Sequence, residues 1–264
     1  MSISNQTKSR LQAKELRKRI QAIKNLKLEV TDLDYLKEQL LPIVHSYFHI
    51  SPIANYGQLV FRGVHWREKP TNKKQLSYPP AEIIKTFQRV NRPHKPMFYG
   101  SVGCHSTILE LAPQTGDRIA ISKWRVIKPL YLNSLGYSED IFRDAGSSEW
   151  EKKWWVQRLN EDPKILFTNE NKLVHDFLNR EFTKKVSPNA AYQYKATVAI
   201  SELFLKELTF IGQPQIENPF TKQIEPADVF SNIEFSGLLY PSVANTLNAD
   251  NLALKPEIVT NVLN

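Results

Sequence analysis

Four polar side chains interrupt otherwise apolar stretches of the sequence and are of types that can do chemistry. They are a guanidinium, a phenol, a carboxylate and a hydroxyl: Arg62, Tyr99, Glu110 and Ser242. A guanidinium matches phosphate oxygens bidentately, and a carboxylate stabilises positive charge that develops on a sugar. Taken singly, each also has an ordinary structural explanation: a strand end, a satisfied core tyrosine, a solvated helix residue, and a turn residue after Pro241. The combination and its order therefore carry the chemical interpretation.

The motifs of the commonest catalytic and cofactor sites are absent from the chain. There is no Walker loop, no glycine-rich dinucleotide fingerprint and no HExxH metal motif. Cys104 precedes His105, but one cysteine without a second cysteine or a spaced histidine pair is a poor zinc site. We therefore expect Cys104 to be a core residue, and we expect no bound metal.

The composition predicts a folded globular protein. The chain has 264 residues, 41% of them hydrophobic, which is enough to bury a core. A single cysteine allows no intrachain disulfide and fits a reducing compartment. No apolar run reaches the roughly 20 residues of a membrane-spanning helix, and the N-terminus has no apolar region typical of a secretory signal. We therefore expect a cytoplasmic protein without membrane contact.

The N-terminus carries much of the formal net charge of +8, which favours an anionic partner. Residues 8–27 hold eight Lys or Arg residues and a single acid. A helix is predicted over residues 8–28, with Leu16, Ile20 and Ile23 near one face and cations on the others. The cations fit a nucleic-acid or partner contact, and they fit equally a solvated helix packed by its apolar stripe.

A second helix is predicted from apolar residues at helical spacing: Leu33, Leu36, Leu40, Val44 and Tyr47. Thr31 and Asp34 are expected to form its capping box. Pro42 is expected to kink or end it, because proline removes a backbone hydrogen bond.

The remainder of the chain mixes strands with short helices, which predicts an α+β fold. Strands are predicted at residues 58–62, 97–100, 118–126, 128–132 and 234–239. Helices are predicted at residues 106–111, with Ser106 or Thr107 near the cap, and at 173–182 and 192–205. Residues 138–185 are charged and are interpreted as a helical insertion. Large aromatic residues usually carry packing, so three tryptophans of the insertion are expected in a core: Trp150, Trp154 and Trp155.

Several stretches carry a family resemblance when they are taken in order. Residues 237–245 read Gly-Leu-Leu-Tyr-Pro-Ser-Val-Ala-Asn and are followed by Asn-Leu-Ala-Leu at 251–254. Residues 95–101 read Lys-Pro-Met-Phe-Tyr-Gly-Ser and run into Glu110, and Phe61-Arg-Gly63 gives an aromatic–arginine pair. Together with the strand-like Lys-Trp-Arg-Val-Ile-Lys-Pro-Leu at residues 123–130, these stretches resemble the RES family, named for its Arg, Glu and Ser residues.

The resemblance covers residues 56–135 and 192–254. It implies an ADP-ribosyltransferase-like mixed sheet in a catalytic domain at residues 51–264, with a basic helical extension at 1–50 and the insertion at about 138–185. It also implies a bacterial toxin that is paired with an antitoxin protein and uses NAD+ as its substrate. Where many family members have Gly-Arg-Trp-Asn, this chain has Val-Asn-Arg-Pro-His at residues 90–94, so Arg92 stands in for the family arginine.

The resemblance implies a role for each residue in cutting the nicotinamide–ribose bond. Glu110 would stabilise the oxocarbenium-like sugar or orient the nucleophile. Arg62 would clamp the pyrophosphate with help from Arg92, and Tyr99 would stack on the nicotinamide or its ribose. Ser242 would bond a ribose hydroxyl or hold Glu110. Three functions stay open. The first is NAD+ depletion. The second is ADP-ribosyl transfer to RNA, DNA or protein, which the basic arm favours, and the third is a catalytically inactive nucleic-acid-binding module.

Overall fold

A computed structural model describes the chain in these ranges: residues 11–47, 53–54, 56–137, 168–207, 215–217, 224–226, 235–244 and 250–263. Within them, a mixed sheet has the strand order β1-β5-β8-β9-β3-β2-β4. Its strands are β1 (Ile53–Ala54), β2 (Leu59–His65), β3 (Phe98–Ser101), β4 (Ile119–Arg125), β5 (Leu130–Ser134), β8 (Gly237–Pro241) and β9 (Asp250–Leu254). Strands β5 and β8 pair in parallel, and the other neighbours pair antiparallel. The predicted α+β class is therefore confirmed.

Strands β8 and β9 form the centre of the sheet and are buried on both faces. Successive side chains of a strand point to opposite faces. Leu238, Tyr240 and Ala253 accordingly join one core cluster, and Leu239 and Leu252 join the other. Glycine is required at Gly237, because a Cβ there would lie 2.1 Å from the carbonyl oxygen of Ala253. The two apolar motifs of the resemblance are thus the innermost strands.

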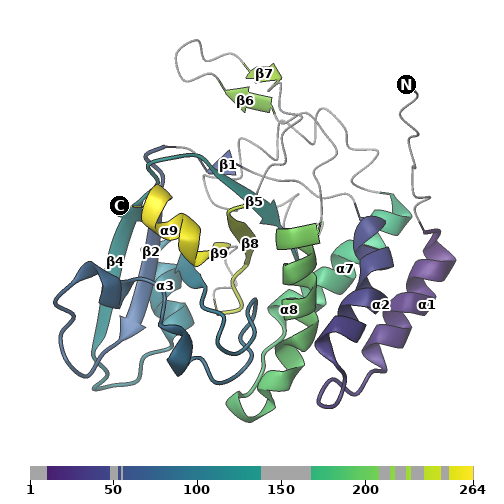
Figure 1. Cartoon of the computed structure of the whole chain (residues 1–264), viewed down its shortest axis with the longest axis horizontal. Coiled ribbons are helices and arrows are strands. Elements are labelled where there is room, and N and C mark those ends of the chain that lie inside the picture. The colour runs from purple at the N-terminus through teal and green to yellow at the C-terminus, as the bar shows by residue number, and fades with distance from the viewer. Residues whose placement is uncertain are drawn as a thin grey trace.

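A layer of helices covers one face of this sheet (Figure 1). It comprises α1 (Ala13–Lys24), α2 (Leu33–His45), α7 (Asn169–Thr183) and α8 (Lys195–Glu202). The other face packs against α9 (Pro256–Val262), through Val259 and the following Leu263. Two short strands, β6 (Gln215–Glu217) and β7 (Ile224–Pro226), pair only with each other among the described residues.

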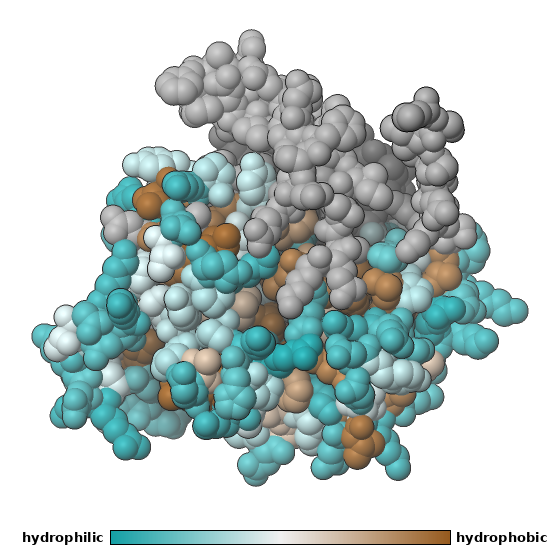
Figure 2. All heavy atoms as spheres, viewed as in Figure 1, coloured by the Kyte–Doolittle hydropathy of each residue, from teal (hydrophilic) through white to brown (hydrophobic). Residues whose placement is uncertain are grey.

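Helix α1 is part of the core rather than an appendage. Leu16, Ile20 and Ile23 are buried in the same cluster as residues of α2, α7, α8 and the sheet. This confirms that the apolar stripe packs the helix, although α1 is shorter than the predicted residues 8–28. The opposite side is exposed, and the edge of the molecule at α1 is mostly hydrophilic (Figure 2).

The predicted cap of α2 was wrong. Asp32 is the N-cap, and its carboxylate accepts hydrogen bonds from the backbone N–H groups of Asp34 and Tyr35. These bonds lower the pKa of Asp32 below its usual value. Thr31 instead donates its hydroxyl to the carbonyl of Lys27. Pro42 does not end the helix, which continues to His45.

The predicted helix at 192–205 is three consecutive elements. They are a 3-10 helix η3 (Pro188–Tyr194), then α8, then a π-helix η4 (Leu203–Glu207). Helix α7 confirms the predicted helix at 173–182, and Trp150, Trp154 and Trp155 lie outside the described residues. Strand β9 and helix α9 were not predicted. In the described part of the chain, no helix combines the length and hydropathy that a membrane crossing requires.

Replacing Leu16 by alanine tests whether α1 belongs to the core. The Leu16 side chain is fully buried, so its truncation should reduce the free energy of unfolding by about 2–5 kcal/mol in urea titrations. Lys14→Ala, on the exposed side of the same helix, is the matched control and should change it by about 0.5 kcal/mol or less. Equal effects of the two variants would contradict the packing described for α1.

Candidate functional site

Strands β2 and β3 separate after a single residue pair. Phe61 pairs with Ser101, and no further pair joins the two strands. By contrast, β2 pairs with β4 along its whole length, and all four residues of β3 pair with β9. The sheet is therefore open between β2 and β3, at the level of Arg62, Gly63, Tyr99 and Gly100.

The side chain of Arg62 supplies hydrogen bonds in this opening. Its Nη1 donates to the carbonyl oxygen of Tyr99 and its Nε to that of Ser77, both at 2.7 Å. Its guanidinium carbon lies 5.4 Å from the centre of the Phe98 ring. Burial lowers the pKa of Arg62 to about 10, so the side chain stays cationic at neutral pH. Arg62 lies in the middle of β2, not at a strand end as predicted.

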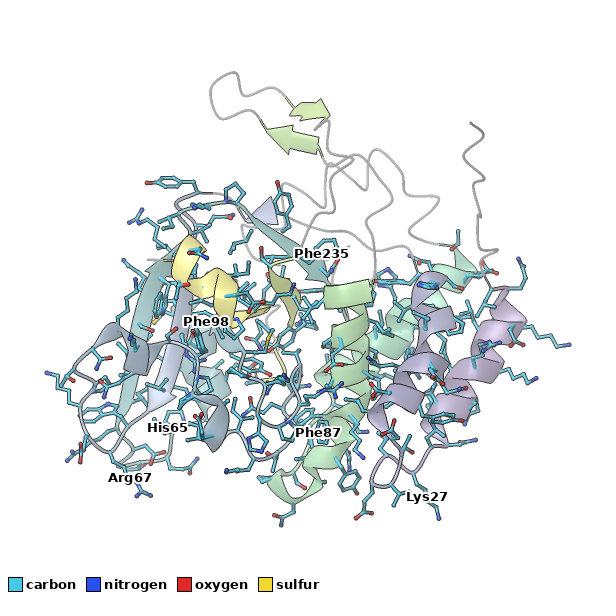
Figure 3. All side chains as sticks on the ribbon, in the orientation of Figure 1. Lys27, His65, Arg67, Phe87, Phe98 and Phe235 are labelled. Atoms are coloured by element: carbon cyan, nitrogen blue, oxygen red, sulfur yellow. The ribbon has the colours of Figure 1, made fainter. Side chains whose placement is uncertain are left out.

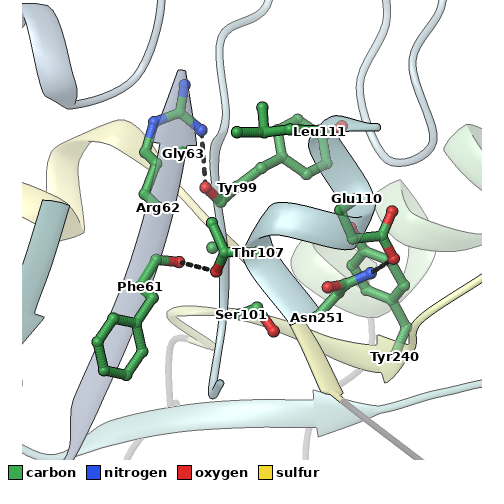
Figure 4. A pocket seen from close by; sticks show the side chains of 11 residues that line it. Phe61, Arg62, Gly63, Tyr99, Ser101, Thr107, Glu110, Leu111, Tyr240 and Asn251 are labelled. Atoms are coloured by element: carbon green, nitrogen blue, oxygen red, sulfur yellow. Dashed lines mark hydrogen bonds between the residues drawn. The ribbon is translucent and has the colours of Figure 1, made fainter. Parts of the chain in front are cut away.

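A pocket with a volume of about 230 Å³ lies beside the opening (Figure 4). Residues of β2, β3, α3 (Cys104–Leu111), β8 and β9 line it: Phe61, Arg62, Gly63, Tyr99, Gly100, Ser101, Thr107, Glu110, Leu111, Tyr240 and Asn251. Figure 4 shows Arg62 and Glu110 on opposite sides of this pocket. The pocket thus has a cation on one wall and a carboxylate on the other, and the aromatic residues Phe61, Tyr99 and Tyr240 also line it.

Helix α3 packs closely on β2 and so fixes the carboxylate wall. A Cβ on Gly63 would lie 2.4 Å from Leu111 Cδ1, so glycine permits this approach. Thr107 donates its hydroxyl to the carbonyls of Gly103 and, at 3.4 Å, of Phe61. The N-cap is Gly103, so the helix begins two residues before the predicted residue 106, and Ser106 and Thr107 are buried in its first turn. Cys104 is exposed, which corrects the expectation of a core cysteine.

The carboxylate of Glu110 is held through one of its oxygens. Oε1 accepts a hydrogen bond from Asn251 Nδ2 at 2.6 Å and another from the hydroxyl of Ser242. Ser242 follows the last residue of β8, and Asn251 lies in β9, so neighbouring central strands present both donors. In the described part of the chain, Oε2 of Glu110 has no hydrogen-bond partner, and the residue is exposed. Glu110 therefore combines a fixed oxygen with an accessible one.

Tyr99 lines the pocket, but its hydroxyl is engaged elsewhere. The hydroxyl donates to Asn91 Oδ1 at 2.5 Å and accepts from the backbone N–H of Val90 at 3.2 Å. Burial raises the pKa of Tyr99 above its usual value, so the phenol remains neutral. The ring, rather than the hydroxyl, is what Tyr99 offers to a ligand.

Arg92 does not line the pocket. Its guanidinium forms a bidentate ion pair with Glu202 of α8, with Nε–Oε1 and Nη2–Oε2 distances of 2.6 and 2.5 Å. Asp34 of α2 lies 3.9 Å from the same Nη2. The hydrogen bonds that Arg92 donates to Glu202 raise the pKa of Arg92. These contacts join α2, α8 and the segment before β3, so the structure places Arg92 in an ion-pair network and does not bring it together with the predicted residues that line the pocket.

Three of the four residues singled out first line one pocket, and the fourth, Ser242, bonds to one of them. Asn251 and Tyr240 also line it, although sequence reasoning gave them no role. Both lie in the apolar motifs that carry the family resemblance, and their place in these motifs was the signal that could have identified them. Among the described residues, no group of three or more His, Cys, Asp or Glu side chains could hold a metal ion.

Comparison of the chain with protein-family models, with curated proteins and with solved structures found no match.

Replacing Tyr99 by phenylalanine tests the structural role of its hydroxyl. The change leaves the N–H of Val90 and the side-chain oxygen of Asn91 without this partner, and should lower the free energy of unfolding by about 1–3 kcal/mol. Tyr56→Phe, at a side chain that is 73% exposed, is the control and should have little effect. If the Tyr99 hydroxyl served only to bind a ligand, the Tyr99→Phe and Tyr56→Phe proteins would be equally stable in urea titrations, which would contradict the structural role.

Proposed function

We propose that this protein cleaves the bond between nicotinamide and ribose in NAD+, with Glu110 as the catalytic carboxylate. One observation carries the proposal: Glu110 is fixed by Ser242 and Asn251 on the wall of a pocket whose opposite wall carries Arg62. Cation, aromatic rings and carboxylate in one small pocket suit the phosphate, the nicotinamide and the reacting sugar respectively.

The chemistry needs one carboxylate. The C1′–N1 bond breaks and its electron pair stays on N1, so nicotinamide leaves as a neutral base without a general acid. The sugar becomes oxocarbenium-like, and Glu110 stabilises that charge through its accessible oxygen. In hydrolysis, water attacks C1′ and loses a proton to the carboxylate or to solvent, which gives ADP-ribose. With phosphate as the acceptor, the product carries phosphate on C1′.

Arg62 has donors left for a phosphate. A guanidinium carries five N–H donors, and the two carbonyl bonds use one from Nε and one from Nη1. The two N–H groups of Nη2 have no partner among the described residues. Together with the second N–H of Nη1, they remain as donors for the oxygens of an anion. The carbonyl bonds hold the side chain in place, which lowers the entropy cost of binding.

The size of the pocket suits part of the dinucleotide. Sites that enclose a whole drug-sized ligand span about 300–1,000 Å³. The volume of about 230 Å³ here suits nicotinamide and its ribose, and leaves the adenylate half outside. Tyr99 and Tyr240 both line this volume, and the half-buried ring of Tyr99 provides a surface on which nicotinamide can stack.

The proposal includes the context that the sequence resemblance implies. An ADP-ribosyltransferase-like arrangement of the sheet would place the substrate where β2 and β3 separate. A toxin of this kind would act in the cytoplasm, deplete NAD+ and be restrained by an antitoxin protein.

Glu110→Gln is the first test of this proposal. The amide keeps the shape of the side chain but carries no charge to stabilise the sugar cation. Nicotinamide release from NAD+ should fall on the order of 100-fold in kcat, with the fold unchanged by circular dichroism.

Arg62→Lys should act mainly on the KM for NAD+ in the same assay, because a lysine cannot satisfy two carbonyls and a phosphate together.

Arg92→Ala is the matched arginine control for this assay. Its ion pair with Glu202 is partly exposed, so the variant should lose about 1 kcal/mol of stability or less and keep the kcat and KM of the wild type. Nicotinamide release that is no faster in the wild type than in Glu110→Gln would contradict the proposed function.

Transfer of ADP-ribose to a nucleic acid is the second candidate, and the exposed face of α1 favours it. Lys14, Arg17, Lys18 and Lys24 are exposed on this helix while its apolar residues face the core. A row of cations attracts phosphates irrespective of base sequence. Figure 3 shows Lys27, just after α1, on the far side of the molecule from His65 of β2. A nucleic acid bound at this end of α1 would therefore have to cross the molecule to reach His65 of β2.

Replacing Lys14, Arg17 and Lys18 by glutamate separates the candidates. Labelled NAD+ is incubated with total RNA and DNA at several salt concentrations. Under the transfer model, label enters nucleic acid with the wild type and is lost with the charge-reversed protein. Under NAD+ depletion, both proteins release equal nicotinamide and the label stays in small molecules. Steep salt-dependent binding without nicotinamide release would indicate an inactive nucleic-acid-binding module.

A further inference from the structure

Two donors converge on the same oxygen of Glu110, and this determines which oxygen can act. Asn251 Nδ2 and the Ser242 hydroxyl both bond Oε1, while Oε2 has no partner in the described part of the chain. A carboxylate on a helix surface otherwise rotates between several positions. Two donors on one oxygen fix the plane of the group and leave the other oxygen to face a ligand.

The two donors come from positions that the sheet itself fixes. Asn251 is 6% exposed and lies in β9, where it pairs in register with Tyr240 of β8. It also pairs with Ser101 of β3, so both neighbours of its strand hold it. Ser242 is attached directly to the end of β8. The position of the Asn251 amide is thus set by the most buried part of the fold.

We infer that Asn251 is a positioning residue that holds Glu110 with Oε2 directed at the substrate. This role rests on the proposed function, since it specifies how the catalytic carboxylate of that reaction is oriented. Asn251 acts through Glu110, and a loss of orientation should appear in kcat more than in KM. Hydrogen bonds to charged groups are strong enough for their loss to lower kcat about 10- to 100-fold.

Asn251→Asp gives a readout that a merely structural role would not give. An aspartate keeps the shape but places a second carboxylate against Glu110, and two carboxylates in contact cannot both ionise without repulsion. At low pH the pair shares a proton, which restores a donor to Oε1. The kcat of this variant relative to wild type should therefore rise as the pH falls.

The other groups near Asn251 do not produce this trend. Burial keeps Tyr99 and Tyr240 protonated, because it raises the pKa of both, and Arg62 stays cationic below its pKa of about 10. Asp250, the next residue along β9, is bonded by the Tyr137 hydroxyl at 2.8 Å. Asp250 is present in both proteins, so its presence does not distinguish them.

The experiment measures kcat and KM for nicotinamide release from NAD+ across a range of pH in four full-length proteins. They are the wild type, Asn251→Ala, Asn251→Asp and a matched control, Asn133→Ala. Asn133 is fully buried in β5 and donates to the carbonyl of Phe204 at 2.9 Å, so its removal also costs a buried hydrogen bond. The inference expects a lower kcat in Asn251→Ala, little change in Asn133→Ala, and recovery of Asn251→Asp at low pH.

The inference is overturned if Asn251→Ala keeps the kcat of the wild type, or if the ratio for Asn251→Asp does not change with pH. A double-mutant cycle of Asn251→Ala with Glu110→Ala in urea unfolding tests the same contact without catalysis. A coupling between the two sites supports the hydrogen bond, and additive effects overturn it. The cycle remains informative if the wild type releases no nicotinamide, a result that would contradict only the proposed function.

Discussion

The separation of β2 from β3 is the constraint on which the site depends. A sheet that stayed paired here would satisfy the carbonyl of Tyr99 with a backbone N–H from β2. Instead the guanidinium of Arg62 satisfies that carbonyl and the one of Ser77. The opening is therefore stable because a cation supplies the missing hydrogen bonds. The same cation lines the pocket, so one side chain both keeps the sheet open and equips the opening to bind an anion.

The opposite wall is built on the most buried strands. Gly237 allows β8 to lie against Ala253 of β9, and the register of this pair sets Asn251 beside the pocket. Ser242 and Asn251 then fix Glu110, which comes from a different element, α3. Helices on one face and α9 on the other hold β8 and β9 in place. The exposed carboxylate of Glu110 thus has a defined orientation, as the proposed stabilisation of a transition state would require.

Sequence reasoning predicted the class of the fold and singled out residues that the structure brings together at one pocket, and it failed where tertiary contacts decide. The types of these residues and their order along the chain singled out Arg62, Tyr99, Glu110 and Ser242, because polar residues in apolar stretches need an explanation. It missed β9, since Asp250 and Asn251 do not read as a strand until their neighbours pair with them. It assigned Arg92 to the site, because its partner Glu202 is 110 residues away in the sequence. The capping residue of α2 was predicted wrongly for a local reason, because Asp32 lies next to Thr31 and takes the N-cap position.

The central claim is that NAD+ is cut between Arg62 and Glu110 in this pocket. A crystal structure of the Glu110→Gln protein with NAD+ tests it most directly. The claim predicts nicotinamide ribose in the pocket, a phosphate on the free end of the Arg62 guanidinium, and the anomeric carbon about 3–3.5 Å from the side-chain atom at the Oε2 position of residue 110. NAD+ bound at another surface, or a pocket that stays empty at saturating NAD+, would contradict it.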